Sequence, residues 1–335
     1  MKKLIFILAI VLSLAGCNLF TNVDNDDVSD TSASGTSTKL SATSTTALQT
    51  TDAITTTKSE SSTRKKVTTT NPIINGKYRE ITVKGEKAYE IFKLPELTEN
   101  SDPKDFIVDK EGYFLCYIGN AVNIRFPDKV KWFLTPDCKL YCNGKEVRQF
   151  KDAKTFFIPA TMSRGFNFMF DTLLAEQIEK VTLGKGIKKI HADALSGAIN
   201  LKEVILNDDL EEIEDRAFRY AGMPKIKLPK GLKYIGAGVF EGSSLTEINI
   251  PEGVKFIRKW DGIANGMPCF WLCKDLKKVT FDGDKPKIYD DDFQLPFSKI
   301  EGLTFYYYEG AKGFKGDTLK ITDNISYPLV MLPRK

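Results

Sequence analysis

The chain has 335 residues, with 48 basic and 44 acidic side chains and a formal net charge of +4. So balanced a composition gives no reason to expect a nucleic acid partner, because such binding needs basic residues collected on one face. The six cysteines lack the paired Cys-x-x-Cys spacing of a zinc ribbon. We therefore expect no nucleic acid, no metal and no cofactor.

The start of the chain predicts an export signal. Lys2 and Lys3 supply its positive start, residues 4–14 a short apolar core, and Leu14-Ala15-Gly16-Cys17 its end. The alternatives are an ordinary cleaved signal or an uncleaved span, but the core is too short to cross a bilayer comfortably. The end resembles the lipobox of bacterial lipoproteins. That resemblance implies that residues 1–16 are removed and that the Cys17 thiol takes a diacylglyceryl group, whose fatty acids, such as palmitate, anchor the protein in the membrane.

Residues 17–72 follow as a predicted linker. Half of the residues from Thr21 to Thr70 are Ser or Thr, and very few are aromatic or branched apolar. Such a stretch buries too little apolar surface to fold. We expect it to tether the rest of the chain to the membrane, with or without glycosylation of its hydroxyl groups.

We predict that residues 73–174 form an irregular N-terminal cap with irregular repeats. Strand-like alternation occurs at 78–83 and again at 113–118. Asn143-Gly144, between strand-like flanks, is a strong hairpin signal and predicts a hairpin inserted in an early repeat. Cys116, Cys138 and Cys142 lie in this region, and the sequence leaves their disulfide state open.

Residues 175–309 carry a repeat. Each repeat has three recurring segments, which we call its first, second and third lines. The first line is an apolar-x-apolar strand that recurs about every 22–24 residues, a period in the range of leucine-rich repeats. Because side chains alternate along a strand with a period of two residues, the two flanking residues of each strand lie on one face. The strands are Val181-Thr182-Leu183, Val204-Ile205-Leu206, Ile226-Lys227-Leu228, Ile248-Asn249-Ile250, Val279-Thr280-Phe281 and Leu303-Thr304-Phe305.

Two further lines recur in register with the first. The second follows a turn and ends on Ile190, Ile213, Ile235 and Ile257. The third is a small residue followed by a bulky one: Ala194-Leu195, Ala217-Phe218, Val239-Phe240 and, after an insertion, Cys269-Phe270. In the second-line turn Asp209 replaces the glycine of other repeats, which predicts a positive φ there and a modest gain in stability on Asp209→Gly.

These repeats resemble the BspA-type leucine-rich repeat of bacterial surface proteins, whose consensus is similar to L-x-x-I-x-I-P-x-x-V-x-x-I-G-x-x-A-F. The match is close from Leu245 to Ile257, and a weaker copy runs from Tyr117 to Pro127. The repeat after Phe281 departs from the pattern. The resemblance implies a mainly β repeat solenoid with irregular caps, and residues 310–335, after an aromatic segment from Phe305, are expected to form the C-terminal cap.

The residue before each strand alternates in charge through Lys180, Glu203, Lys225, Glu247 and Lys278. Neighbouring parallel strands lie about 4.8 Å apart, so we expect a ladder of ion pairs that disfavours a slip by one repeat.

Two groups of residues are candidates for binding. The first is the middle residue of each strand, which alternation turns away from the core: Thr182, Ile205, Lys227, Asn249, Thr280 and Thr304. The second lies in the insertion that follows the second line of one repeat, because insertions in solenoids form surface loops. Its members are Arg258, Trp260, Ile263 and Met267. The alternative is that the three apolar side chains fold back and pack over the irregular repeat that follows Phe281.

Other reactive residues carry no recognisable site. His191 is the only histidine and is expected at a tolerant, exposed turn without a partner for a triad or a metal. The acidic run Asp290–Asp292, with Asp282 and Asp284, lacks EF-hand spacing and predicts a solvated loop rather than a calcium site. Cys269 and Cys273 occupy small inward slots and are expected to be packed thiols.

No catalytic residue is predicted, and the chain is interpreted as a non-catalytic, lipid-anchored protein on the extracytoplasmic side of the membrane. The family resemblance implies adhesion, with a host or neighbouring-cell surface protein or glycan as partner. The first alternative is a structural role in the cell envelope. The second, less favoured by the sequence, is an enzyme with its site in residues 73–174.

Overall fold

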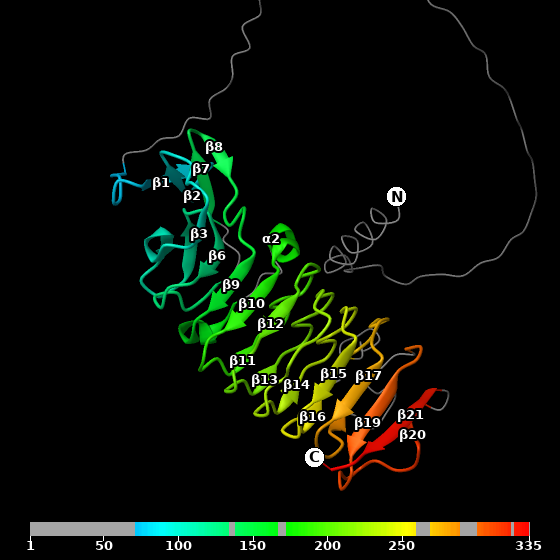
Figure 1. Ribbon diagram of the computed structural model, residues 1–335. Coiled ribbons are helices and arrows are strands. Elements are labelled where there is room, and N and C mark those ends of the chain that lie inside the picture. The colour runs from blue at the N-terminus through cyan, green and yellow to red at the C-terminus, as the bar shows by residue number, and fades with distance from the viewer. Residues whose placement is uncertain are drawn as a thin grey trace, which may run out of the picture. The chain divides into compact units, whose positions relative to one another are not determined.

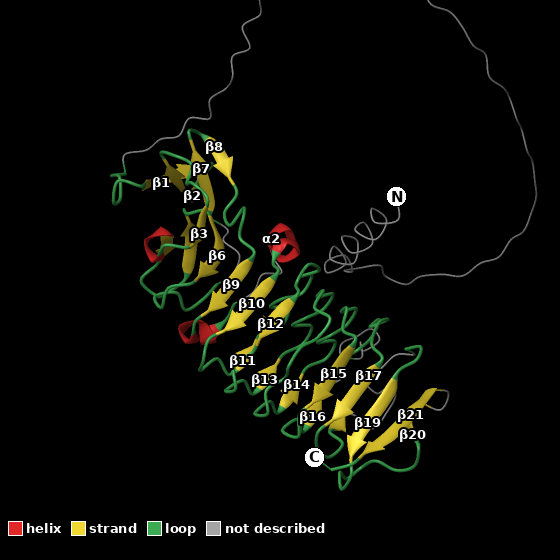
Figure 2. Cartoon of the chain, viewed as in Figure 1, coloured by secondary structure: helices red, strands yellow, loops and turns green. Residues whose placement is uncertain are grey.

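The computed structural model describes residues 71–133, 138–166, 172–258, 269–288, 300–322 and 325–334 (Figure 1). They all belong to the second of two compact units, which spans Ser62–Lys335. The predicted signal, the anchor at Cys17 and most of the predicted linker lie outside the described residues. Strands dominate what is described, as Figure 2 shows, and helix is confined to α2 (Thr172–Gln177) and two 3-10 turns at Pro103–Asp105 and Ala160–Arg164.

A four-stranded sheet opens the described region. Its order is β1 (Tyr78–Val83), β2 (Glu86–Ile91), β7 (Lys139–Cys142) and β8 (Lys145–Val147). β7 and β8 pair antiparallel around Asn143 and Gly144, whose φ angles of 51° and 76° suit a two-residue hairpin turn. The predicted hairpin and the strand predicted at 78–83 are both confirmed. A separate antiparallel pair joins β4 (Phe106–Val108) to β5 (Phe114–Tyr117).

The first line of the repeats forms a parallel sheet that begins earlier in the chain than the regular pattern does. Its order is β12 (Glu203–Ile205), β10 (Lys180–Leu183), β9 (Thr155–Ile158), β6 (Ala121–Arg125) and β3 (Thr98–Asn100). β6 is the core of the weak repeat copy predicted at 117–127. The coils of the solenoid therefore stack into the region before residue 175 (Figure 1).

The sheet is interrupted at Ile226–Leu228, where a strand was predicted and none is formed. In the coils on either side, the residue two places before the first inward apolar position donates its amide to the preceding coil, as Lys202 N does to Glu179 O at 2.8 Å and Thr246 N to Pro224 O at 2.9 Å. Pro224 holds that position here and has no amide N–H to donate. Ile226 and Leu228 are nevertheless buried, so the alternation of the strand survives the loss of its hydrogen bonds.

Beyond the interruption the parallel sheet resumes. It contains β15 (Glu247–Ile250), β17 (Lys278–Phe281), β19 (Thr304–Tyr308) and β21 (Ile325–Leu332), and β20 (Thr318–Thr322) closes it as an antiparallel edge on β21.

The second line forms its own parallel sheet of two-residue strands. Its order is β11 (Lys189–Ile190), β13 (Glu212–Ile213), β14 (Tyr234–Ile235), β16 (Phe256–Ile257) and β18 (Lys287–Ile288). Ile257 pairs with Ile288 in the same register as the earlier isoleucines. The repeat after Phe281, which looks irregular in sequence, thus keeps its second line.

The third line stacks phenylalanine rings along the core. Phe218 and Phe240 are parallel with centroids 5.8 Å apart, and Phe240 and Phe270 follow at 5.5 Å. Phe240 N donates to Cys269 O at 2.9 Å, so the third line passes from one coil to the next in spite of the insertion that precedes Cys269. Cys269 and Cys273 are fully buried, as expected of packed thiols, and burial raises the pKa of Cys273 to about 11.

The expectation for Asp209 is wrong. Asp209 has a negative φ, and so do two glycines at the equivalent turns, Gly231 and Gly253, whereas a third, Gly186, has a φ of 94°. Gly253 is required for space instead, because a Cβ there would lie 2.3 Å from Lys230 O of the preceding coil. The Asp209 side chain instead bonds the preceding coil, because the Gly186 amide donates to Asp209 Oδ2 at 3.0 Å.

Candidate binding surface

One row of side chains runs across the outward face of the repeat sheet. We call it the outward row and define it by the register of the paired strands, in which each member lies beside the next. Lys227 joins it by alternation within the interrupted segment. Its members are Arg125, Phe157, Thr182, Ile205, Lys227, Asn249, Thr280, Tyr306 and Val330.

Four of the predicted strand residues lie on this row and are accessible. Lys227 and Asn249 are exposed, Ile205 is 40% exposed, and Thr182 is half-buried. A single exposed apolar side chain such as Ile205 is ordinary on a protein surface. The row therefore offers a mixed polar and apolar surface rather than a charged one.

Thr280 and Thr304 do not lie where they were expected. Thr280 belongs to the row, beside Tyr306 in the register, but its side chain is buried and only 3% exposed. Thr304 pairs with Lys278 and so lies two residues before the row. The segment 303–307 fits the apolar-x-apolar pattern at two offsets, and the sequence could not choose between them.

The predicted charge ladder is present in part. Lys180 Nζ lies 2.6 Å from Glu203 Oε2, and Lys225 Nζ lies 2.6 Å from Glu247 Oε1. A parallel row just before it was not predicted: Glu179 lies 2.7 Å from both Lys154 and Lys202. Hydrogen bonds from these two lysines lower the pKa of Glu179 to about 2. Both rows link consecutive coils and help fix their register.

A shallow depression of about 490 Å³ lies at the N-terminal end of the outward row. Its floor is formed by β3, β6, β9 and β10, and its lining is uncharged except for Arg125 and Lys180. The repeat pattern does not reveal this depression, because the segment between β3 and β9 carries an inserted hairpin that hides the repeat period. The only signal available was the alternation in Ala121–Arg125.

A second groove of about 670 Å³ lies at the turns that follow the first line in the last coils. It is lined by cations and anions in similar number, including Lys230, Lys255 and Arg334 with Glu252 and Glu309. Such a mixed lining gives no marked preference for ligands of either charge.

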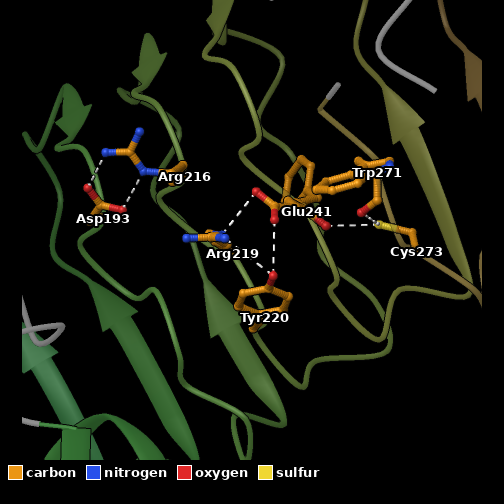
Figure 3. Close-up of polar contacts among 8 residues, drawn as sticks. Asp193, Arg216, Arg219, Tyr220, Glu241, Trp271 and Cys273 are labelled. Carbon is orange, nitrogen blue, oxygen red and sulfur yellow. Dashed lines mark hydrogen bonds and ion pairs between the residues drawn. The ribbon is translucent and has the colours of Figure 1, made fainter. Parts of the chain in front are cut away.

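A buried polar cluster connects three coils at the third line (Figure 3). Arg216 donates to both carboxylate oxygens of Asp193 at 2.8 and 2.7 Å. Glu241 is fully buried, 3.0 Å from Arg219 Nε, and accepts from Tyr220 Oη at 3.1 Å. Burial raises the pKa of Glu241, against the opposing effect of Arg219. Only Glu241 is fully buried, but the polar groups of the cluster are paired with one another across the coils, so the cluster is structural.

The insertion residues Trp260, Ile263 and Met267 lie outside the described residues, as does the acidic run Asp290–Asp292. Arg258 is described and lies against the body of the repeats, with Nη1 3.7 Å from Asp215 Oδ2. In the described part of the chain, no three or more His, Cys, Asp or Glu side chains are grouped to hold a metal ion.

His191 is half-buried rather than exposed. Its Nδ1 lies 3.3 Å from Glu214 Oε2, and its Nε2 is buried without a hydrogen-bond partner among the described residues. Glu214 also accepts from the Ala192 amide and from Lys189, both at 3.0 Å. The carboxylate therefore ties two coils together and orients the ring.

No helix in the described ranges is both long and apolar enough to span a membrane.

No curated protein sequence matches the chain. Several solved structures are similar to it at low TM-scores. A leucine-rich repeat protein of T. pallidum has 19% identity and a TM-score of 0.33 over 54% of this chain and 71% of that one. The pneumococcal vaccine antigen PcpA has 13% identity and a TM-score of 0.32 over 72% and 94%, and a leucine-rich repeat protein of Bacteroides ovatus has 16% and 0.29 over 70% of each.

The family comparison agrees with the repeat geometry. The chain is a β-rich repeat solenoid, and its residues 167–295 match the family model described as a BspA type leucine rich repeat region, in six copies.

Proposed function

We propose that this chain is a non-catalytic surface protein that binds a protein or glycan partner through the outward row. The observation that carries the proposal is the register: consecutive coils present one outward side chain each, at the spacing of paired strands. Surfaces of this kind are large and regular, and repeat proteins use them for recognition.

The face is also held rigidly, which favours binding. Parallel hydrogen bonds, the stacked phenylalanines and the ion pairs between coils fix the backbone beneath the row. A partner that meets a preorganised surface does not have to order it, and this raises affinity for a given contact area.

The proposal includes a location. The end of the export signal at Cys17 supports a lipid anchor on the extracytoplasmic side of the membrane, and the Ser/Thr-rich stretch supports a tether between anchor and repeats. Cell-surface adhesion follows from that placement together with the BspA-type repeats.

The test uses cells that display the full chain. Protease added to intact cells should degrade the protein, and the cells should adhere to at least one member of a panel of glycans and extracellular-matrix proteins. Cys17→Ser should release the protein from the membrane fraction and abolish adhesion by the cells. Retention of the variant in membranes after a high-salt wash contradicts the anchor. Protease resistance with co-purification of envelope components supports the scaffolding alternative instead.

A further inference from the structure

On the outward face, Arg125 has no carboxylate partner among the described residues, and nothing above gives it a specific role. We propose that Arg125 and its neighbours bind the carboxylate of an acidic sugar, such as a uronic or sialic acid. The site consists of Asn100, Asn123, Arg125, Thr155 and Phe157, in the depression of about 490 Å³ at the N-terminal end of the outward row. This inference rests on the proposed function and specifies the ligand chemistry of one part of that surface.

Arg125 is exposed, and its guanidinium carbon lies 3.9 Å from the centroid of the Phe157 ring. An arginine held over an aromatic ring keeps its N–H donors free at the edge of the guanidinium plane. Those donors match the two oxygens of a carboxylate in a bidentate pair. The ring thus positions the cation, and the ligand supplies the anion.

Arg125 differs in this respect from most other arginines in the described ranges, although Arg148, which donates to Gln177 Oε1 at 2.6 Å, and Arg334 also have no ion pair there. Four others lie within ion-pair distance of a carboxylate: Arg79 with Glu90, Arg216 with Asp193, Arg219 with Glu241, and Arg258 with Asp215. The acid that follows β3, Asp102, is engaged elsewhere, because its Oδ1 accepts from the Lys104 amide at 2.8 Å. The described part of the chain provides no ion pair for Arg125.

A row of uncharged polar groups lies beside Arg125. Thr155 Oγ1 donates to Asn123 Oδ1 at 2.6 Å, and Asn123 Nδ2 donates to Asn100 Oδ1 at 3.3 Å. This chain of bonds fixes the amides and leaves the Asn100 Nδ2 donors without a partner among the described residues. Amide and hydroxyl groups of this kind suit the hydroxyl groups of a sugar ring.

The charge of the depression selects among acidic ligands. Its other cation, Lys180, is already paired with Glu203 at 2.6 Å. One uncompensated positive charge among neutral donors and acceptors matches one carboxylate among hydroxyl groups. A polyacidic peptide or a polysulfated chain would require several free cations, which the described lining of the depression does not offer.

The experiment measures binding of the full chain, solubilised in detergent, to matched probe pairs. The pairs are trigalacturonate with its methyl ester and 3′-sialyllactose with lactose. We expect the acidic member of at least one pair to bind at least tenfold more tightly than its neutral counterpart. Equal binding within both pairs, no binding by either acid, or tighter binding of a glutamate-rich peptide overturns the proposal.

Variants then assign the effect to Arg125. Arg125→Gln should weaken binding of the acid at least tenfold, and Arg125→Lys should also weaken it, because lysine keeps the charge without the planar fork. The matched control is Lys274→Gln, which removes an exposed cation that lies after the third line, outside both the outward row and the depression, and should leave binding unchanged. Because Arg125 is exposed, both glutamine variants should keep the wild-type melting temperature. Unchanged binding in Arg125→Gln rejects the site.

The proposed function can survive the failure of this inference. If cells displaying the protein adhere to the panel but adhesion does not depend on carboxylates or on Arg125, only the acidic-sugar site is wrong. If the cells adhere to nothing, the proposed function fails as well.

Discussion

The third line and the first line of the repeats respond differently to a break in the sequence pattern. At the third line, Phe218, Phe240 and Phe270 stay stacked although an insertion precedes the last of them. At the first line, one proline at position 224 is enough to remove a strand. The core stack tolerates the insertion because Phe240 N still donates to Cys269 O, whereas a sheet needs a donor from every coil. The comparison indicates that core packing sets the register and that the outward sheet depends on it.

The largest expected effect comes from breaking the stack. Phe240→Ala removes the middle ring and should lower the free energy of unfolding by about 3–5 kcal/mol, because it loses buried area and leaves a cavity between two rings. Denaturant unfolding measures this. Phe240→Leu is the matched control and should lose much less, since it keeps most of the volume. A loss below about 1 kcal/mol in the alanine variant contradicts the role given to the stack.

The next effect comes from the buried cluster at the same line. Arg219→Met leaves Glu241 buried without its cation and should destabilise by about 3 kcal/mol at neutral pH. Burial already raises the pKa of Glu241, and loss of Arg219 raises it further. A carboxyl group with a raised folded pKa makes its full contribution to the free energy of unfolding below the unfolded pKa of about 4.3. That contribution is lost as the pH rises through the folded pKa.

The deficit of Arg219→Met relative to wild type should therefore be small below pH 4 and grow toward pH 7, as measured by thermal unfolding at several pH values. Adding Glu241→Gln should remove this pH dependence. A deficit that does not change with pH means that Glu241 is not the group responsible.

Asp209 tests the turn that joins the first and second lines. Asp209→Gly should lower the free energy of unfolding by about 1–2 kcal/mol, because it removes the acceptor for the Gly186 amide and adds freedom to the unfolded chain. The turn glycine pattern alone suggested the opposite sign. Asp209→Asn keeps an oxygen acceptor and should lose less. Stabilisation by the glycine variant would restore the interpretation based on positive φ.

The smallest effect concerns the charge ladder on the outward sheet. Glu203→Lys places a third positive charge between Lys180 and Lys225 and should lower stability by a few tenths of a kcal/mol, roughly. The effect should shrink in high salt because the pairs are exposed. Glu203→Gln removes the attraction to Lys180 without adding a positive charge. It should lower stability by about half as much as Glu203→Lys. Identical melting temperatures at low salt would leave the ladder without a role in register.

The regular coils were predictable because their three lines recur together, and chance rarely repeats three patterns in register. The first coils were harder, since the hairpin β7–β8 lengthens the segment between β6 and β9. Phe157 was missed for a related reason: Thr155–Ile158 reads as a buried apolar run, while the pairing of β9 with β10 turns Phe157 to the outward row.

The buried cluster could not be predicted from single positions. Arg219 and Glu241 occupy equivalent places in successive coils, after Phe218 and Phe240, and only stacking of the coils brings their charges together. A charged residue at a place that the repeat otherwise buries is the signal that was available. Thr280 was also wrongly expected to be exposed: alternation within its strand turns it outward, but its side chain is 3% exposed in the stacked coils.

The most direct test of the account compares two isoleucines in cells that display the full chain. Ile205 lies on the outward row and is 40% exposed, while Ile199 follows the third line and is 48% exposed. Arginine at either position should fold, because both side chains already reach solvent. If the outward row is the binding surface, Ile205→Arg abolishes adhesion to the panel member that wild type binds, and Ile199→Arg retains it. Adhesion that survives Ile205→Arg, or that is lost in Ile199→Arg alone, contradicts the account.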